Sequence, residues 1–85
     1  MRLLETSKFQ KLRKKLKDDD ERAALREAVL QVLEAPEAGE KLKRELRELR
    51  AFRFAVRGQA RRLIYMHDKD AVVLFSFGPR QGIYK

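Results

Sequence analysis

The nineteen residues LRAFRFAVRGQARRLIYMH, Leu49–His67, decide the fold of this 85-residue chain. Apolar and polar residues alternate through the first half of the stretch, and this period of two predicts a strand with one buried and one exposed face. Gly58-Gln59 predicts a turn, and Arg61–His67 predicts the returning strand of a β-hairpin. The stretch carries five arginines and no acidic residue, so the hairpin concentrates positive charge.

The chain begins with the short apolar stretch Arg2–Glu5, which predicts an edge strand. Ser7 and Gln10 have the spacing of a capping box and predict the start of a first helix. The apolar residues of that helix recur at intervals of three and four positions and predict one narrow buried stripe, formed by Phe9, Leu12 and Leu16.

A second helix is predicted from Asp18, because Asp18 and Glu21 again have capping-box spacing and acidic residues stabilise a helix N-terminus. Its buried stripe comprises the apolar residues Leu25, Ala28, Val29, Val32 and Leu33. The helix must end before Pro36, and Pro36–Gly39 is expected to be a loop. The short connection between the two helices predicts an antiparallel helical hairpin.

After the arginine-rich hairpin, Asp68–Asp70 predicts a turn into Ala71–Phe77, the most apolar and therefore the expected central strand. The predicted order is βααβββ in a single domain, residues 1–85. The fold class is α+β, with a two-helix hairpin packed on one face of a small, mainly antiparallel four-stranded sheet. The other face of the sheet is expected to be open and basic.

The charge of the chain is unevenly distributed. Residues 1–40 hold nine basic and nine acidic residues, whereas residues 41–85 hold twelve basic and four acidic residues, so the whole net charge of +8 lies in the second part. A surface formed by this basic second part predicts an anionic, extended partner, for which a polynucleotide backbone is the best match. The absence of cysteine excludes disulfides and cysteine-based metal sites. No apolar run can span a bilayer or act as a signal sequence, so we expect a cytoplasmic protein without a membrane partner.

Three motifs, taken with their order and spacing, carry a family resemblance. They are Phe52-Arg53-Phe54 after the Leu42, Leu46 and Leu49 stretch, Arg62-Leu63-Ile64-Tyr65, and Phe77-Gly78-Pro79-Arg80 followed by Tyr84. Over essentially the whole chain, this pattern resembles the RelE/ParE toxin superfamily of type II toxin–antitoxin systems. RelE-like members are ribosome-dependent endoribonucleases that cut mRNA in the A site, and ParE-like members inhibit DNA gyrase. Both kinds are silenced by a cognate antitoxin.

The resemblance to the RelE-like branch implies a metal-independent endoribonuclease that needs no cofactor. By position in the family pattern, the catalytic residues are Arg62, Arg80 and Tyr84, and Arg53 binds substrate. Arg57 and Arg61 join Arg53 as expected substrate-binding residues, although adjacent Arg61 and Arg62 must point to opposite faces of their strand. The implied partners are mRNA in the ribosomal A site, rRNA, and an acidic antitoxin protein.

These residue types suit cleavage by attack of the 2′-hydroxyl on the adjacent phosphate. Arginine binds phosphate oxygens in a bidentate manner but does not carry protons near neutral pH, so Tyr84 is the expected proton-transfer group. Ala55 stands where the best-known relatives carry a basic residue, and an attenuated or non-catalytic RNA-binding protein is therefore one alternative. A ParE-like gyrase inhibitor is the other. His67, beside Asp68 at a strand end, is interpreted as a surface turn residue.

Overall fold

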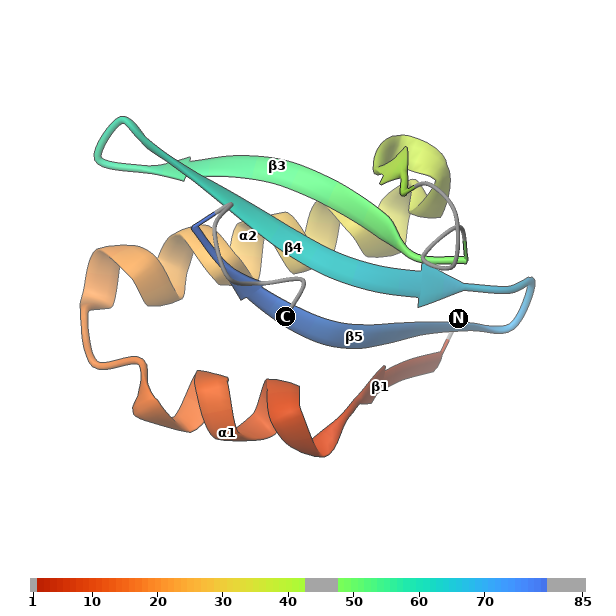
Figure 1. Cartoon of the computed structure of the whole chain (residues 1–85), viewed down its shortest axis with the longest axis horizontal. Coiled ribbons are helices and arrows are strands. Elements are labelled where there is room, and N and C mark those ends of the chain that lie inside the picture. Colours follow the sequence, from red (N-terminus) through yellow and green to blue (C-terminus); the bar gives the residue numbers. More distant parts are fainter. Residues whose placement is uncertain (1, 43–47, 80–85) are drawn as a thin grey trace.

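The computed structural model describes residues 2–42 and 48–79. Its elements are β1 (Arg2–Glu5), α1 (Ser7–Lys15), α2 (Asp19–Glu34), the 3₁₀ turn η1 (Pro36–Ala38), β2 (Glu40–Lys41), β3 (Arg50–Val56), β4 (Gln59–His67) and β5 (Ala71–Gly78). The two helices run antiparallel and pack on one side of a twisted sheet (Figure 1), so the predicted α+β class is confirmed. No helix in the described ranges is long and apolar enough to cross a membrane.

The sheet differs in detail from the four-stranded prediction. It has five strands in the order β1-β5-β4-β3-β2, and it is mixed, because β1 pairs with β5 in parallel while the other pairings are antiparallel. The prediction missed β2 because two residues are too short to show an alternating pattern. The central strand is β4, and not β5 as hydropathy suggested. Two strands lie on each side of β4, whereas only β1 lies outside β5.

Both helices begin at side-chain caps, one of them a residue earlier than predicted. Thr6, not Ser7, caps α1, because its hydroxyl accepts a hydrogen bond from the Phe9 amide at 3.1 Å. The same hydroxyl donates to the Phe75 carbonyl at 3.1 Å and so fixes the start of α1 to β5. Asp18 caps α2 as predicted, accepting from the Glu21 amide at 3.1 Å. The second helix ends at Glu34, ahead of the proline.

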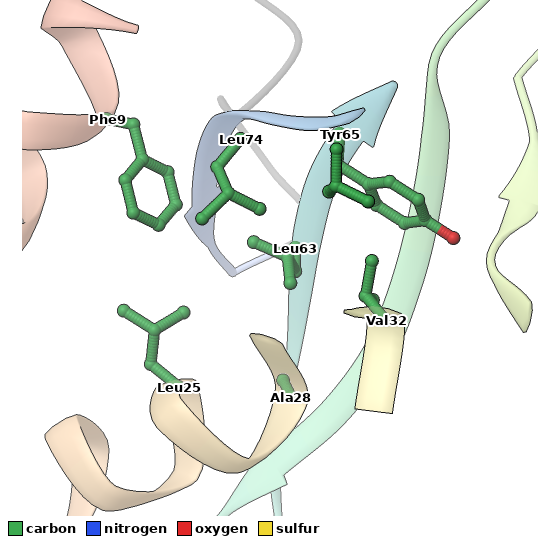
Figure 2. Close-up of a cluster of buried hydrophobic side chains, with 8 residues drawn as sticks. Phe9, Leu25, Ala28, Val32, Leu63, Tyr65 and Leu74 are labelled. Carbon is green, nitrogen blue, oxygen red and sulfur yellow. The ribbon is translucent and has the colours of Figure 1, made fainter. Parts of the chain in front are cut away.

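The core lies between the helical pair and the sheet. The residues buried there come from α1, α2, β4 and β5, and comprise Phe9, Leu25, Ala28, Val32, Leu63, Tyr65, Val72 and Leu74 (Figure 2). Tyr65 is the largest of them and is fully buried. At about 25 cal/mol per Å² of apolar area removed from water, this single layer provides most of the driving force for folding in so short a chain.

The turn between β3 and β4 comprises Arg57 and Gly58, one residue earlier than predicted. Both have positive φ angles, 48° and 79°, and Val56 pairs directly with Gln59. Two such residues are typical of the tight hairpin turn whose twist matches that of the flanking strands. The tight turn fixes the register of the hairpin and therefore decides which arginines face each other.

Candidate nucleic-acid interface

The pairing of β3 with β4 separates the arginines of the hairpin between the two faces of the sheet. Leu63 and Tyr65 point toward the helices, so Arg62 and Ile64, which alternate with them, point to the other face. Arg53 lies directly opposite Arg62 and shares that face. The predicted substrate-binding residue Arg53 and the predicted catalytic residue Arg62 are thus brought side by side.

Two arginines in directly opposite positions repel each other, and such pairs destabilise a sheet. The only acidic group in the described part of the chain that forms an ion pair with Arg53 is Glu40, whose Oε2 lies 3.4 Å from the Arg53 guanidinium. Both side chains are about 70% exposed, at 70% and 68%, so this ion pair adds little stability. The arrangement favours an anion that binds between the guanidinium groups.

The face opposite the helices is exposed only in part. Near the hairpin turn, Ala55 and Ala60 pair with each other and are both exposed, as is Arg53, while Arg62 is half-buried. Farther along the same face, Ala51, Ile64 and Ser76 are buried. Among the described residues of this face, the accessible basic surface therefore lies at the hairpin end of the sheet, and it is narrower than the open face predicted.

The structure places Arg57 and Arg61 against α2. Arg57 lies 2.8 Å from Asp18 and 3.0 Å from Asp20, and Arg61 lies 3.3 Å from Glu21. The hydrogen bond from Arg57, aided by the Glu21 amide, lowers the pKa of the Asp18 carboxyl below its ordinary value. These contacts attach the hairpin to the start of α2. Substrate binding by Arg57 and Arg61 remains a prediction, and an anionic ligand would have to compete there with carboxylates.

Tyr65 fastens the η1 segment to the sheet, a role that the sequence did not reveal. Its hydroxyl donates to the Pro36 carbonyl at 2.6 Å and accepts from the Gly39 amide at 2.9 Å. The Arg50 guanidinium donates to the Gly39 carbonyl at 2.8 Å from the other side. Burial raises the pKa of the Tyr65 hydroxyl above its ordinary value. A Cβ at position 39 would lie 2.5 Å from that hydroxyl oxygen, so only glycine fits.

Two predicted site residues, Arg80 and Tyr84, remain to be considered, together with the single histidine, His67. Arg80 and Tyr84 lie outside the described residues, and their roles remain predictions. His67 lies on the helix side, where its ring is 6.4 Å from that of Tyr65 and it pairs with buried Val72. Within residues 2–42 and 48–79, no group of three or more histidine, aspartate or glutamate side chains is arranged to hold a metal ion.

A second surface feature is a groove of about 730 Å³ between the two helices, beside β1. Its floor is apolar and includes Leu16, Val29 and Leu33, while Leu3 and Leu30 at its edges are 42% and 51% exposed. Basic residues of both helices and of the connection between them line it, namely Arg13, Lys14, Lys17, Arg22 and Arg26. Glu5 also lines the groove and forms an ion pair with Arg13 at 2.6 Å. An apolar floor with a basic rim suits an amphipathic segment of opposite charge.

A helical hairpin on one face of a small mixed sheet, with paired arginines on the other, defines a small basic α+β protein. The chain belongs to the family of ParE-like toxins of type II bacterial toxin–antitoxin systems, whose family model matches residues 3–85. The resemblance to the RelE/ParE superfamily is thereby confirmed. None of the curated protein sequences compared with the chain matches it significantly.

Solved structures show the same fold. The toxin in the crystal structure of the intact E. coli RelBE toxin–antitoxin complex is 22% identical, with a TM-score of 0.73 over 94% of this chain and 96% of that one. The isolated E. coli RelE toxin is 27% identical, with a TM-score of 0.71 over 98% and 89%. A copper-bound mutant toxin from Helicobacter pylori is 20% identical, with a TM-score of 0.64 over 98% of each chain.

Proposed function

We propose that this type II toxin is a ribosome-dependent endoribonuclease of the RelE-like kind, which acts on mRNA in the cytoplasm. The observation that carries the proposal is the pairing of Arg53 with Arg62 across β3 and β4, on the face of the sheet away from the helices. Two guanidinium groups at neighbouring positions can hold the two sides of one phosphate. The similarity to the isolated E. coli RelE toxin supports the proposal.

In the proposed reaction the 2′-hydroxyl attacks the adjacent phosphate, and charge accumulates on the phosphoryl oxygens. Arg62, together with Arg80, neutralises that charge, and Arg53 positions the RNA backbone. Tyr84 transfers the proton needed by the leaving 5′-oxygen. Arg57 and Arg61 add positive potential at the hairpin end. A site with so few proton carriers depends on the ribosome to hold the mRNA in line for attack.

We further propose that the groove between α1 and α2 receives the cognate antitoxin. The RelBE structure is a complex of a related toxin with its antitoxin. The basic residues along this groove predict an acidic amphipathic segment, whose apolar side would cover Leu3 and Leu30. The neighbouring reading frame should therefore encode a short acidic protein that relieves toxicity when it is produced together with the toxin.

The test is to induce the chain in growing cells and to map mRNA ends by primer extension. Growth arrest with discrete cuts inside translated codons is expected for the wild type. Arg62→Ala should reduce cleavage roughly 10²–10³-fold, the usual effect of removing one charge-stabilising group. Arg26→Ala, which removes an exposed arginine on the helix side, is the matched control and should cut normally. Full cleavage by Arg62→Ala would contradict the proposed site.

A second candidate is inhibition of DNA gyrase, because the matching family model is that of ParE-like toxins. Under this alternative, cells arrest with DNA damage signalling and intact mRNA. A third outcome, RNA binding without arrest or cleavage, would indicate an attenuated protein, in keeping with the exposed alanine at position 55.

A further inference from the structure

We infer that Asp18 and Asp20, at the start of α2, compete with RNA for Arg57 and release it only when an RNA chain is bound. The inference rests on the proposed binding of RNA to Arg53 and Arg62 at the hairpin end of the sheet. It is drawn from the ion pairs of Arg57, from the exposure of the groups that form them, and from the place of this arginine in the hairpin.

Arg57 is held by two carboxylates of the helical layer. Its Nη1 lies 2.8 Å from an oxygen of Asp18 and 3.0 Å from an oxygen of Asp20. At the turn Arg57 leaves the extended conformation of β3, with a φ angle of 48°, and its side chain contacts α2. Continued alternation of the strand would instead place it on the face of Arg53. Carboxylate oxygens thus occupy the place at this guanidinium that phosphate oxygens would take.

The ion pairs of Arg57 can be broken at little cost. The three side chains are between 43% and 69% exposed, and ion pairs between exposed groups contribute little to stability. After release, the Asp18 carboxylate keeps the hydrogen bond from the Glu21 amide at 3.1 Å. The start of α2 also stabilises the remaining negative charge, because the helix dipole favours anions there. Release of Arg57 therefore leaves no buried charge behind.

Arg61 is held more firmly and stays in place when Arg57 exchanges partners. Its side chain is only 17% exposed, and its guanidinium lies 3.3 Å from Glu21. The same guanidinium donates a hydrogen bond to the Ala60 carbonyl of its own strand at 3.1 Å. Arg61 also lines a cavity of about 380 Å³ between the helices and the hairpin end of the sheet. The ion pair of Arg61 with Glu21 therefore keeps the hairpin attached to α2.

The position of Arg57 suits a further contact with a bound chain. It lies four residues beyond Arg53, roughly 13 Å along an extended strand. Ala55 and Ala60 lie between them and are both exposed, so an extended anionic chain can pass over this part of the sheet. An RNA chain bound at Arg53 presents its next phosphates to Arg57 at a high local concentration, whereas a small free anion does not. The two carboxylates therefore favour polymers over small anions.

The experiment measures affinity for a short fluorescent single-stranded RNA by fluorescence anisotropy at low salt. The 2′-hydroxyls of this RNA are methylated, so that it cannot be cut. Asp18→Asn with Asp20→Asn removes both competing charges, and asparagine at position 18 still caps α2. Two exposed ion pairs together correspond to roughly 2–30-fold in an equilibrium constant, and we expect the RNA affinity to rise within that range. In an Arg57→Ala background this gain should disappear.

The control removes two charges from the same helix without breaking a contact of Arg57. Asp19→Asn with Glu27→Gln changes two exposed acids of α2, and Arg57 pairs with neither of them. The effect of the control on RNA affinity should be small, and equal with and without Arg57. Urea titration of each variant checks that the chain is folded.

Three results would overturn the inference. An unchanged affinity, or equal gains with and without Arg57, would mean that the two acids act at most through net charge. A loss of affinity would mean that Asp18 and Asp20 hold the hairpin in the shape that binds RNA. A wild type that does not bind this RNA would also overturn it. Cleavage on ribosomes is measured separately: if mRNA stays intact while the affinities change as expected, the nuclease function fails and the inference stands.

Discussion

Replacing Tyr65 with phenylalanine tests how strongly the η1 segment is held to the sheet. The ring is fully buried, and Figure 2 shows its hydroxyl pointing out of the core cluster. The substitution removes only that oxygen, and leaves the Gly39 amide and the Pro36 carbonyl without their side-chain partner. The free energy of unfolding should fall, while the packing of the ring in the core is preserved.

The magnitude follows from these two contacts. A buried polar group left without a partner costs about 1–3 kcal/mol. The Gly39 contact is buried and the Pro36 contact is partly buried, so water can replace part of the second one. We expect a total loss of about 2–3 kcal/mol. With a urea dependence of about 1–3 kcal/mol per M, the unfolding midpoint followed by circular dichroism should fall by roughly 0.7–3 M.

A double-mutant cycle provides the control. Gly39→Ala brings a Cβ to 2.5 Å from the same hydroxyl oxygen and should displace the segment by a different route. Because both changes break one contact, the double variant should lose clearly less stability than the sum of the single losses. An unchanged urea midpoint for Tyr65→Phe, or simple additivity in the cycle, would refute the reasoning.

The same residue predicts a dependence on pH. The pKa of Tyr65 is raised in the folded protein, so above about pH 10 the unfolded chain releases this proton more readily than the folded one. The contribution of Tyr65 to stability is therefore complete below that pH and is lost as the pH rises further. Urea titrations at increasing alkaline pH should show a decline that is smaller in Tyr65→Phe.

Three further predictions concern the cap, the hairpin attachment and the paired arginines. Thr6→Ala should lower the free energy of unfolding by about 1–2 kcal/mol in urea titrations, because it removes the cap of α1. Ser7→Ala is the control and should have little effect. The reverse result would identify Ser7 as the cap. Arg57→Ala should reduce stability at neutral pH and low salt, and the difference should shrink in high salt and below about pH 4, where Asp18 loses its favourable charge. Equal differences under all these conditions would contradict an electrostatic attachment. Arg62→Ala should flatten the dependence of RNA affinity on salt concentration by somewhat less than one unit of logarithmic slope, and an unchanged slope would exclude a phosphate contact.

Much of the fold could be predicted because it depends on local patterns in the sequence. The alternation in β3 and β4 and the periodic apolar residues of α2 each depend on neighbours within a few positions. The parallel pairing of β1 with β5 could not be predicted in this way, because it joins residues about seventy positions apart and leaves no local signal. The shift of the turn to Arg57 was also missed, since arginine rarely adopts a positive φ angle.

The candidate site was predicted in part for similar reasons. Alternation alone could separate Arg61 from Arg62, but only the register of the hairpin could place Arg53 opposite Arg62. The contacts that hold Arg57 and Arg61 to α2 join distant parts of the sequence. The contact of Glu40 with Arg53 could not be predicted either, because it depends on β2, a strand of only two residues.

The parallel pairing of β1 with β5 at the edge of the sheet affects how the toxin folds during its synthesis. During synthesis the helical hairpin emerges early, yet β5, which joins β1 to the rest of the sheet and packs against α1, is the last of the described strands to appear. Contacts over such long separations form late and slowly. A chain cut after Asp70 should therefore remain largely unfolded by circular dichroism, and Arg53 and Arg62 would be aligned only after β5 has been made.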